Sequence, residues 1–460
     1  MKKTPRVIAV EILNRIEETD AFAEPLLDAF LSRRLTNLHD KRLLTNIVYG
    51  TLRMRGNLDW IIRQIYRGNL TDMKAGIKNI LRTGLYQAMF TDRIPDFAIV
   101  DEAVKITKNL YPANSGLVNA VLRNAIRKRS EIVYPRLEDA PLLHISIVYS
   151  HPLWLVERWV EMFGIDRTIS ICKANNEIPP LTLRVNRWKT TREEVVKKMR
   201  HDGFNVRTTD FSPHGVVLIN PAVPPREIPY YQMGYVSVQD EASQLIAHLV
   251  NPRQGENVLD ICAGAGGKTC HLAEIMGNQG NILALDISAQ KMESLKNTAK
   301  RLGITILETF AGDATRNLGS TLRREFDRVL VDAPCSCLGT LRRNPEIKWR
   351  LSSEELKSFA YLQKKLLDSA SSYVKKGGTL IYSTCTIMSE ENEDVVEDFL
   401  RQHKNFRCLQ PPGVIDSQMV DDKGFFKTDS HRHGTDGFFA AILEKTSDRI
   451  ISGQEGNELN

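Results

Sequence analysis

Two cysteines in this chain follow apolar, β-branched runs, at positions where a thiol could do covalent chemistry. Cys335 comes three residues after Asp332, which ends the run VLVD, and Cys385 directly follows the run LIYST. Such runs predict strands, and open parallel α/β sheets bind their ligands beyond the carboxyl ends of the strands. A thiol at each of two neighbouring strand ends predicts that one sulfur attacks a substrate and the other helps to reverse the attack. The alternative is that both cysteines are small buried hydrophobic residues.

A glycine-rich turn lies between another predicted strand and a helix, in residues 257–269 (NVLDICAGAGGKT). Gly264, Gly266 and Gly267 let the backbone approach a ligand closely, and the helix that follows exposes amide donors. A phosphate-binding loop would need glycine where Cys262 stands, and a dinucleotide fingerprint would need glycine where Thr269 stands. Both templates therefore fail by one residue.

Carboxylates follow the next predicted strands. Asp286 ends a strand about 20 residues beyond the glycines, where a carboxylate can bind ribose hydroxyls. Asp313 lies in a short polar turn, AGDA, that suits an adenine edge. Either aspartate alone could instead be a helix cap or a turn residue. Together they repel phosphate and suit a nucleoside that carries a positive sulfonium, so we predict S-adenosylmethionine as the cofactor.

The composition is that of a globular protein with ordinary intracellular chemistry. The 460 residues are enough for about three domains, and no long uncharged apolar run could span a membrane. The seven cysteines are an odd number spread thinly along the chain, which argues against a disulfide framework, and Cys335-x-Cys337 lacks a partner pair at zinc spacing. Glu11 and Arg15 interrupt the first apolar run, so we expect a first helix rather than a signal peptide.

Positive charge is concentrated at the front of the chain. Residues 1–130 hold 22 Lys and Arg against 13 Asp and Glu, although the net charge of the whole chain is only +6. Apolar residues recur there at helical spacing, which predicts a helical bundle over residues 1–135. Its last helix ends in Arg127, Lys128 and Arg129, which suit a helix C-terminus and also a phosphate backbone. We therefore expect this domain to meet a polyanion, with a merely solvated basic surface as the alternative.

Two further domains are predicted behind this bundle. Residues 142–234 contain an amphipathic helix (151–164) and then a strand, a charged helix and two short strands, which indicates a small α+β domain. From 235 to 446 strands and helices alternate strictly, which predicts a parallel sheet with helices on both faces. The strands are expected near 256–261, 281–285, 304–309, 327–331 and 378–383, with helices that begin near Lys268, Ser288, Ser353 and Glu391. Two final strands around a polar turn and a polar tail, 447–460, complete the prediction.

Six segments together resemble, in order, the motifs of RNA 5-methylcytosine methyltransferases. They are NVLDICAGAGGKT, ALDIS, AGDAT, VLVDAPCSCLGTLRRNPEIKW, IYSTCTIMSEENEDVV and DGFFAAIL. With QDEASQLIA before the first strand and a front that resembles NusB-like RNA-binding domains, nearly the whole chain is similar to the RsmB (Sun) family of bacterial 16S ribosomal RNA cytosine-C5 methyltransferases. The resemblance implies a multidomain protein with an all-α NusB-like bundle, a small α+β domain and an α/β Rossmann-like S-adenosylmethionine-dependent methyltransferase domain.

The resemblance also implies a role for each thiol. A thiolate that adds to C6 of cytosine makes C5 able to accept a methyl group, after which the C5 proton must leave and the thiol must be expelled. Spacing alone does not say which sulfur attacks. The resemblance implies that Cys385 is the nucleophile and Cys335 assists product release, while Asp332 would hold or protonate the base at N3. We expect charged surroundings, supported by Lys268, to lower the pKa of Cys385, unless Lys268 is only a surface lysine.

The expected cofactor contacts and two departures from the family follow from the same motifs. The family usually has proline where Ala265 stands, so some rigidity of the turn is lost. It commonly has glycine where Cys337 stands, and for this third thiol we expect a packing role, with a redox role as the alternative. The expected cofactor-binding residues are Cys262, Ala263, Gly264, Ala265, Gly266, Gly267, Lys268, Asp286, Asp313 and Asp332.

The expected partner is small-subunit ribosomal RNA, and the chain is expected to act as a cytoplasmic monomer without a metal ion or a membrane. Two other functions remain compatible with the sequence. A P-loop-like nucleotidase is one, because GGKT precedes a helix and RVLVDAP resembles a Walker B strand. A non-catalytic RNA-binding assembly factor that uses the helical front is the other. The sequence does not indicate which cytosine is modified, or whether the substrate is free RNA or an assembled particle.

Overall fold

The computed structural model describes residues 4–19, 21–33, 37–92, 94–221, 224–316 and 325–447. The chain divides into two compact units, unit 1 with residues 1–178 and 341–353, and unit 2 with residues 179–340 and 354–460. The predicted tail lies outside the described residues from residue 448 onward. Within the described part of the chain, no helix is long and apolar enough to cross a membrane.

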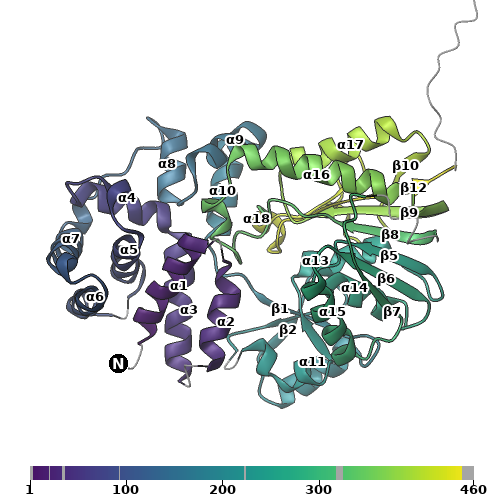
Figure 1. The fold of residues 1–460 in the computed structure, drawn as a ribbon, viewed down its shortest axis with the longest axis horizontal. Helices are drawn as coiled ribbons and strands as arrows, with labels where there is room; N and C mark the ends of the chain where they lie inside the picture. The colour runs from purple at the N-terminus through teal and green to yellow at the C-terminus, as the bar shows by residue number, and fades with distance from the viewer. Residues whose placement is uncertain are drawn as a thin grey trace, which may run out of the picture. The chain divides into compact units, whose positions relative to one another are not determined.

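Unit 1 is helical, as predicted for the front of the chain (Figure 1). Helix α5 lies at its centre and is buried on nearly all sides, because α1, α3, α4, α6 and α7 pack around it. Its one buried cation, Arg82, donates to Asp59 at 2.6 and 2.8 Å and to Glu17 at 3.0 Å, so the charge at the centre of the bundle is paired. The helices are α1 Pro5–Thr19, α2 Ala23–Arg33, α3 Leu38–Arg53, α4 Arg55–Ile65, α5 Ala75–Phe90, α6 Asp96–Leu110, α7 Ser115–Arg127, α8 Pro141–Val148, α9 Leu153–Phe163 and α10 Ile165–Asn175.

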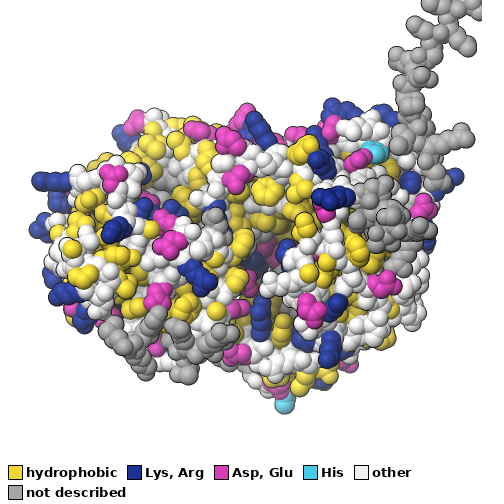
Figure 2. Space-filling view, viewed as in Figure 1, with side chains coloured by type: hydrophobic (Ala, Val, Ile, Leu, Met, Phe, Trp, Pro, Cys, Tyr) yellow, Lys and Arg dark blue, Asp and Glu magenta, His cyan; other side chains and the backbone are white. Residues whose placement is uncertain are grey.

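The basic residues at the end of α7 are exposed and partly paired. Arg129 binds Asp96 at 2.8 Å, and Lys128 lies 3.5 Å from Glu131. Arg127 donates to the side chain of Asn124 at 2.7 Å. On the face of the molecule in Figure 2, Lys and Arg side chains are interspersed with Asp and Glu over unit 1, which lies at the left. The excess of positive charge is therefore spread over the visible surface of the unit.

A short segment from the second half of the chain, residues 341–353, is built into unit 1. The Glu346 carboxylate accepts a hydrogen bond from the backbone N–H of Ala23 at 2.7 Å, and the Trp349 indole donates to the carbonyl of Leu52 at 2.9 Å. Lys348 is only 1% exposed, and burial lowers its pKa to about 7. The chain therefore passes directly from the loop of Cys335 into the core of the helical unit, which the sequence did not predict.

Unit 2 begins with a small α+β domain whose four-stranded sheet has the order β2-β3-β1-β4, with every pair antiparallel. The predicted strand, helix and two short strands are confirmed. Strand β4 was not predicted. The elements are β1 Leu181–Val185, α11 Arg192–His201, β2 Val206–Thr208, β3 Gly215–Leu218, α12 Pro229–Gln232 and β4 Val236–Val238.

The rest of unit 2 is an α/β domain around an eight-stranded sheet of order β10-β12-β9-β8-β5-β6-β7, with β11 paired to β12. The five predicted strands are confirmed as β5 to β9, although β7 begins three residues later than expected. The elements are α13 Glu241–Val250, β5 Asn257–Ile261, α14 Gly267–Ile275, β6 Asn281–Asp286, α15 Ala289–Leu302, β7 Leu307–Ala311, β8 Phe326–Asp332, α16 Ser353–Ser371, β9 Val374–Thr384, α17 Glu393–Gln402, β10 Phe406–Leu409, β11 Phe426–Lys427, α18 Ser430–His433 and β12 Phe439–Lys445.

The expectation of a purely parallel sheet is wrong at one edge. Strands β5 to β9 are parallel, but β12 runs antiparallel to β9, and β10 runs antiparallel to β12. The chain leaves β9 at one end of the sheet and enters β12 at that same end, so β12 runs in the opposite direction to β9. The edge strand β10 is a further element that the sequence reading missed.

Both faces of this sheet are covered, because neighbouring residues of each strand point to opposite sides. Leu259 and Val329 pack on the side of α16 and α17, whereas Val258 and Leu330 pack on the side of α13, α14 and α15 (Figure 1). The strand order reverses between β5 and β8. In open α/β sheets the crevice at such a reversal, beyond the carboxyl ends of the strands, is where ligands bind.

Candidate active site

Cys335 and Cys385 lie side by side beyond the carboxyl ends of β8 and β9. The strands pair in parallel with Asp332 opposite Ser383, so the segments that follow them leave the sheet together. The two sulfur atoms are 3.3 Å apart, and the backbone N–H of Cys385 donates to the sulfur of Cys335 at 3.4 Å. Cys335 is buried, whereas Cys385 is partly exposed. The structure thus brings the two predicted thiols into contact.

Cys337 adds a third thiol to this cluster. Its sulfur lies 3.4 Å from that of Cys385, and its backbone has a φ of +57°. A positive φ favours glycine, so a glycine would fit the backbone at this position without strain. The sulfur atoms of Cys335, Cys337 and Cys385 all lie within 4.8 Å of one another, so the cluster could also hold a soft metal ion.

A buried carboxylate, Glu391, holds the loops of both thiols. It accepts hydrogen bonds from the backbone N–H and the hydroxyl of Ser336 and, at 3.0 Å, from the amide of Gln363. The hydroxyl of Ser336 also lies 2.9 Å from that of Thr386, the residue after the second thiol. Burial raises the pKa of Glu391. The sequence did not single out this residue, because it lies in a short 3-10 helix (Ser389–Glu391) within an acidic run and has no characteristic spacing to either cysteine.

Asp332 occupies the space between the thiol loops and the glycine turn. It accepts from the ammonium of Lys268 at 2.7 Å and from the hydroxyl of Ser383 at 3.0 Å. Burial acts to lower the pKa of Lys268, but the charge of Asp332 and their hydrogen bond outweigh it, so the pKa is raised and the lysine stays positive. The ammonium also lies 5.1 Å from the centre of the Phe438 ring. Lys268 is therefore a partner of Asp332 and not a free surface lysine.

The glycine turn is shaped by left-handed backbone conformations. Cys262 has a φ of +67°, Gly264 of +57° and Gly266 of +85°. A Cβ atom on Gly266 would lie 2.6 Å from the side chain of Leu295, so glycine is required there. A Cβ on Gly264 would meet no atom closer than 4.0 Å, so at that residue the turn faces open space that a ligand can fill. Ala263 donates its N–H to the carbonyl of Leu285 at 2.9 Å, and this bond fixes the turn to β6.

The two remaining predicted aspartates lie at the ends of β6 and β7. Asp286 is buried and accepts from the N–H of Gly264 at 3.0 Å and from the N–H of Ser288 at 2.9 Å. Asp286 therefore holds the glycine turn and also the start of helix α15, which follows β6. Asp313 accepts from the hydroxyl and the N–H of Thr315, and these bonds lower the pKa of its carboxyl group.

Asp260 is a fourth carboxylate of this region, and the sequence reading did not select it. It is fully buried in β5, where one oxygen accepts from the hydroxyl of Thr269 at 2.6 Å and the other has no hydrogen-bond partner among the described residues. Burial raises its pKa to about 7. A carboxylate inside an otherwise apolar strand, NVLDI, is the signal that could have identified it.

The prediction that charged surroundings lower the pKa of Cys385 is wrong for this structure. The hydrogen bond with Cys335 lowers the pKa of Cys385. The hydrogen bond with Cys337, burial and the negative charge of Asp332 outweigh this effect and raise the pKa to well above the ordinary thiol value. The positive charge of Lys268 does not reverse this balance because Asp332 already neutralises it. Without its substrates the site therefore keeps Cys385 as a protonated thiol.

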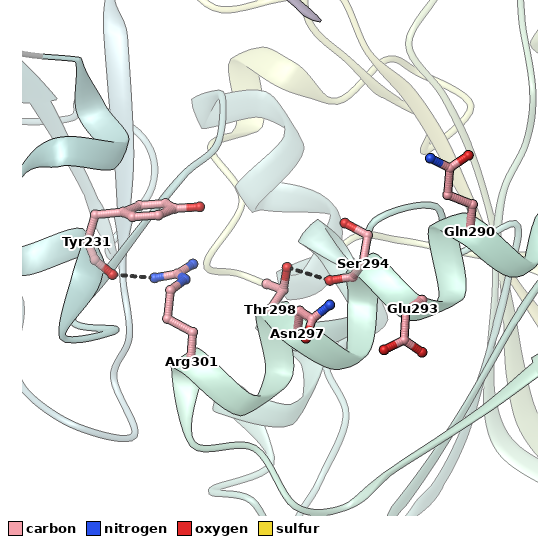
Figure 3. Close-up of a pocket in the computed structure, with 7 residues that line it drawn as sticks. All are labelled: Tyr231, Gln290, Glu293, Ser294, Asn297, Thr298 and Arg301. Atoms are coloured by element: carbon pink, nitrogen blue, oxygen red, sulfur yellow. Dashed lines mark hydrogen bonds between the residues drawn. The ribbon is translucent and has the colours of Figure 1, made fainter. Parts of the chain in front are cut away.

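A surface groove in unit 2 lies apart from these residues (Figure 3). It is lined by α15 and by Tyr231, whose ring stacks on the guanidinium of Arg301 at 3.8 Å. None of the predicted site residues lines it. The groove is open and polar, so it does not compete with the sheet edge as the place of the chemistry.

Three family models match successive parts of the chain. The NusB family model matches residues 3–127, the ferredoxin-like domain of the RsmF/B-like methyltransferases matches residues 151–224, and the 16S rRNA methyltransferase RsmB/F model matches residues 247–444. The small α+β domain is therefore ferredoxin-like, and the predicted three-domain fold class is confirmed.

Similar proteins match over nearly the full length. "Probable ribosomal RNA small subunit methyltransferase B" of Bacillus subtilis (strain 168) is 36% identical and covers 97% of this chain and 100% of its own. Ribosomal RNA small subunit methyltransferase B of Pseudomonas syringae pv. tomato is 33% identical over 96% of this chain and 97% of its own. The crystal structure of PH0851 is 30% identical with a TM-score of 0.83, over 97% of this chain and 100% of that one. On this evidence the chain belongs to the RsmB (Sun) family of S-adenosylmethionine-dependent ribosomal RNA methyltransferases.

Proposed function

We propose that this protein transfers a methyl group from S-adenosylmethionine to C5 of a cytosine in 16S ribosomal RNA, through a covalent bond between Cys385 and C6 of the base. The observation that carries the proposal is the contact of two thiols, 3.3 Å apart, beside a carboxylate at the reversal point of a parallel sheet. Carbon 5 of cytosine is a weak nucleophile, so this chemistry needs a group that first adds to C6.

The residues of the glycine turn fit the cofactor. When bound, S-adenosylmethionine supplies a methyl group on a positively charged sulfonium. Gly264 leaves room at the turn, and Asp286 keeps lone pairs that can accept ribose hydroxyls. Asp313 at the end of β7 would serve the adenine edge. Carboxylates on three sides favour a positive ligand and oppose a phosphate.

In the proposed mechanism the two thiols act at different times. Cys385 gives its proton to solvent and forms a bond from sulfur to C6, which places an electron pair on C5 for methyl transfer. The C5 proton then leaves to solvent, and the electrons of the C5–H bond restore the C5–C6 double bond. The bond between sulfur and C6 breaks at the same time, and its electron pair returns to the sulfur of Cys385. Cys335 assists this release, and Asp332 would hold or protonate the base at N3 through a proton that lies between the carboxyl group and N3. The greater exposure of Cys385 supports its role as the attacking thiol.

The roles of the other site residues complete the proposal. Lys268 orients Asp332 through their 2.7 Å ion pair. Glu391 positions the two cysteine loops without touching the base. We further propose a cytoplasmic monomer without a resident catalytic metal, with domains at residues 1–135, 142–234 and 235–446, in which the NusB-like domain binds the RNA.

Two other functions are less well supported. A P-loop-like nucleotidase would need a free lysine for phosphates, but Lys268 is bound to Asp332 among further carboxylates. A non-catalytic assembly factor would have no use for the thiol pair. Equilibrium dialysis of the protein with ATP and with S-adenosylmethionine distinguishes a nucleotidase from a methyltransferase. Retention of cellular function in Cys385→Ala would favour the assembly factor.

The decisive experiment incubates the protein with labelled S-adenosylmethionine and unmodified 16S ribosomal RNA, followed by digestion and identification of the labelled nucleoside. We expect 5-methylcytidine with the wild type and none with Cys385→Ala. A different methylated nucleoside, or full labelling by the variant, would overturn the proposal. Cys408→Ala is the matched control, because this cysteine lies on the edge strand β10 outside the thiol cluster.

A further inference from the structure

Three histidines meet in unit 2 at a place that the methylation chemistry does not use. His214 lies in the turn between β2 and β3 of the ferredoxin-like domain, whereas His248 lies on α13 and His271 on α14 of the methyltransferase domain. Their ring centres are 4.9, 5.5 and 5.3 Å apart, which is nearly an equilateral triangle. Each ring offers a nitrogen atom, and the three nitrogens lie within 4.8 Å of one another.

This triangle has the dimensions of a three-histidine metal site. With metal–nitrogen bonds of about 2.1 Å and tetrahedral angles, ligand nitrogens are about 3.4 Å apart and ring centres about 5.2 Å apart. Nδ1 of His214 and Nε2 of His271 are separated by 3.2 Å. The three centre distances match the expected value to within a few tenths of an ångström, so little movement of the rings would be needed to bind an ion.

The cluster contains a ring nitrogen that could serve as a ligand, because neutral imidazole binds metal ions through an unprotonated nitrogen. Nε2 of His248 is buried without a hydrogen-bond partner among the described residues. Such atoms are costly to bury unless something binds them.

The turn that carries His214 is held in place by α13. One carboxylate oxygen of Glu241 accepts from the backbone N–H groups of Phe211 and Ser212, at 2.5 and 2.7 Å. The hydroxyl of Ser212 donates to the side chain of Gln244 at 2.7 Å, and His248 follows Gln244 by one helical turn. Helix α13 thus fixes the turn of one ligand and supplies another. Such a supported arrangement is typical of preformed metal sites.

The charges around the cluster limit its affinity but do not exclude a cation. Arg184 lies near His271, yet its guanidinium is paired with the carboxylate of Glu274 at 2.8 Å. The positive charge of Arg187 opposes a bound cation. We therefore expect a dissociation constant in the micromolar range, which is weaker than that of dedicated structural zinc sites.

We propose that His214, His248 and His271 form a binding site for a divalent transition-metal ion, best matched by Zn²⁺, that fastens the ferredoxin-like domain to helices α13 and α14. Imidazole ligands suit zinc, copper and nickel rather than magnesium or calcium. His214 is partly exposed, so a water molecule can complete the tetrahedron. The ion would act as a structural link and would take no part in methyl transfer.

A competing interpretation is that the rings only pack together, with one imidazole N–H donating to the next across the 3.2 Å contact. The thiol cluster is a second competitor, because its three sulfur atoms also lie within 4.8 Å of one another and would bind the same ions. The test must therefore separate metal binding by nitrogen from metal binding by sulfur.

The experiment uses the full-length protein without a histidine tag, stripped with a chelator and titrated with Co²⁺. Tetrahedral Co²⁺ absorbs in the visible range, and thiolate ligands add a near-ultraviolet charge-transfer band. We expect the protein to bind one equivalent of Co²⁺ with visible absorption. In Cys337→Gly this absorption should persist, and the near-ultraviolet band of thiolate ligands should be absent. His214→Gln and His248→Gln should each weaken binding at least about tenfold. His201→Ala is the matched control, because its side chain is 89% exposed on the same domain.

A second measurement guards against variants that fold poorly. Added Zn²⁺ should raise the melting temperature of the wild type and of His201→Ala, because a ligand that binds only the folded state stabilises it. The increase should be absent in His214→Gln, which must still bind S-adenosylmethionine to count as folded. Absence of visible Co²⁺ absorption and of a Zn²⁺-induced shift in the wild type would overturn the proposal. Binding that survives in both histidine variants and is lost in Cys337→Gly would also overturn it.

Discussion

The thiol cluster and the histidine cluster of unit 2 are both triangles of side chains that could bind a metal ion, but burial affects their reactivity in opposite ways. In the first, each thiol has one hydrogen bond that lowers its pKa and one that raises it, and burial raises it further, so the pKa values of Cys335, Cys337 and Cys385 lie well above the ordinary thiol value and the thiols stay protonated. In the second, burial lowers the pKa of the rings, so the imidazoles stay deprotonated. Both clusters are neutral. For a histidine this is the ligating state, whereas for a cysteine it is the unreactive one.

Under the proposed mechanism, in which Cys385 is the nucleophile, this thiol therefore has to be activated when its ligands bind. Lys268 is the nearby cation, but its charge is already neutralised by Asp332 at 2.7 Å. A positive ligand at the carboxylate-lined turn would shift this balance toward the thiolate. We therefore expect the nucleophile to be silent in the free protein, which protects it from unwanted reactions, while the histidine cluster needs no such control.

The largest expected effect separates the two thiols from each other. Cys385→Ala should abolish turnover and leave no covalent adduct, because nothing can then add to C6. Cys335→Ala should methylate once and fail to release the product, so it should accumulate an RNA-linked species that survives denaturation and should be toxic in cells. Gel analysis of the denatured mixture measures this directly.

A substrate with 5-fluorocytosine provides the control for that assignment. The C5 fluorine cannot leave as a proton does, so the wild type should be trapped through Cys385, and peptide mass mapping should locate the bond there. If the adduct maps to Cys335, or if Cys385→Ala is the variant that traps RNA, the two roles are reversed.

The next effect concerns the stability of the region that supports the histidine cluster. Arg184 on β1 and Glu274 on α14 form a buried ion pair at 2.8 Å that joins the two domains of unit 2. Arg184→Met should lower the free energy of unfolding by about 3–5 kcal/mol, because it leaves the Glu274 carboxylate buried and unpaired. Urea denaturation measures the change.

The double variant Arg184→Met/Glu274→Leu tests the cause. It should regain much of the lost stability, because no uncompensated charge remains. Lys105→Ala, which removes an exposed ion pair with Asp101 on α6, should leave the urea midpoint unchanged. A double variant that is less stable than Arg184→Met would show that packing, and not the unpaired charge, dominates at this site.

The pH dependence of the reaction tests the raised pKa of Cys385. Since the folded free protein holds this thiol protonated, the thiolate fraction should rise with pH throughout the neutral range. The value of kcat/KM, which reports on the free enzyme, should then increase about tenfold per pH unit between pH 6.5 and 8.5. The hydrogen bond with Cys337 contributes to the raised pKa, so Cys337→Gly should move the profile toward lower pH. A flat wild-type profile over this range would contradict the picture of a silent nucleophile.

The two clusters also differ in how far the sequence revealed them. Cys335 and Cys385 each follow a strand-forming run, and parallel strands end at the same edge of a sheet. The sequence therefore predicted that both thiols lie at that edge. His214, His248 and His271 lie on a turn and two helices of different domains, and no spacing pattern links the three. Their proximity depends on how the ferredoxin-like turn packs against α13, and this long-range packing leaves no periodic trace in the sequence.

The same contrast explains the other successes and failures. Apolar runs that alternate with helical segments identified β5 to β9, but the antiparallel addition of β12 and β10 depends on chain connections that this pattern does not encode. The incorporation of residues 341–353 into unit 1 was missed because the signal for it is burial of polar groups such as Lys348 and Glu346, which sequence alone makes look exposed. The pKa of Cys385 was misjudged because the sequence shows the nearby lysine but not its ion pair.

A smaller effect is expected at the cofactor turn. Asp286→Ala should weaken S-adenosylmethionine binding by about 1–3 kcal/mol, the value of a hydrogen bond to a charged group. The alanine variant also leaves the N–H groups of Gly264 and Ser288 without their acceptor. Asp286→Asn can still accept hydrogen bonds, so it should lose less affinity for S-adenosylmethionine. Calorimetry measures both variants. Unchanged affinity in Asp286→Ala would remove this residue from the site, whereas Asp313→Ala should have the weaker effect because its side chain is more exposed.

The smallest expected effect lies outside both clusters, on the basic end of α7. If Arg127, Lys128 and Arg129 contact phosphates, replacing all three with alanine should weaken RNA binding at every sequence. The slope of log affinity against log salt should become shallower by about one unit per lost contact. Filter binding at several salt concentrations measures this slope.

The ion pairs of this helix end determine how the three residues should differ. Asp96 competes with phosphate for Arg129, and Glu131 competes with phosphate for Lys128. Arg127 instead donates a hydrogen bond to the neutral side chain of Asn124. Arg127→Ala should therefore reduce the slope more than either other single change, and Asp96→Ala should strengthen binding by freeing Arg129. Lys105→Ala is the matched control, because it removes one exposed positive charge from the neighbouring helix. If it reduces the slope as much as Arg127→Ala, RNA responds to the total charge of the domain and not to the end of α7.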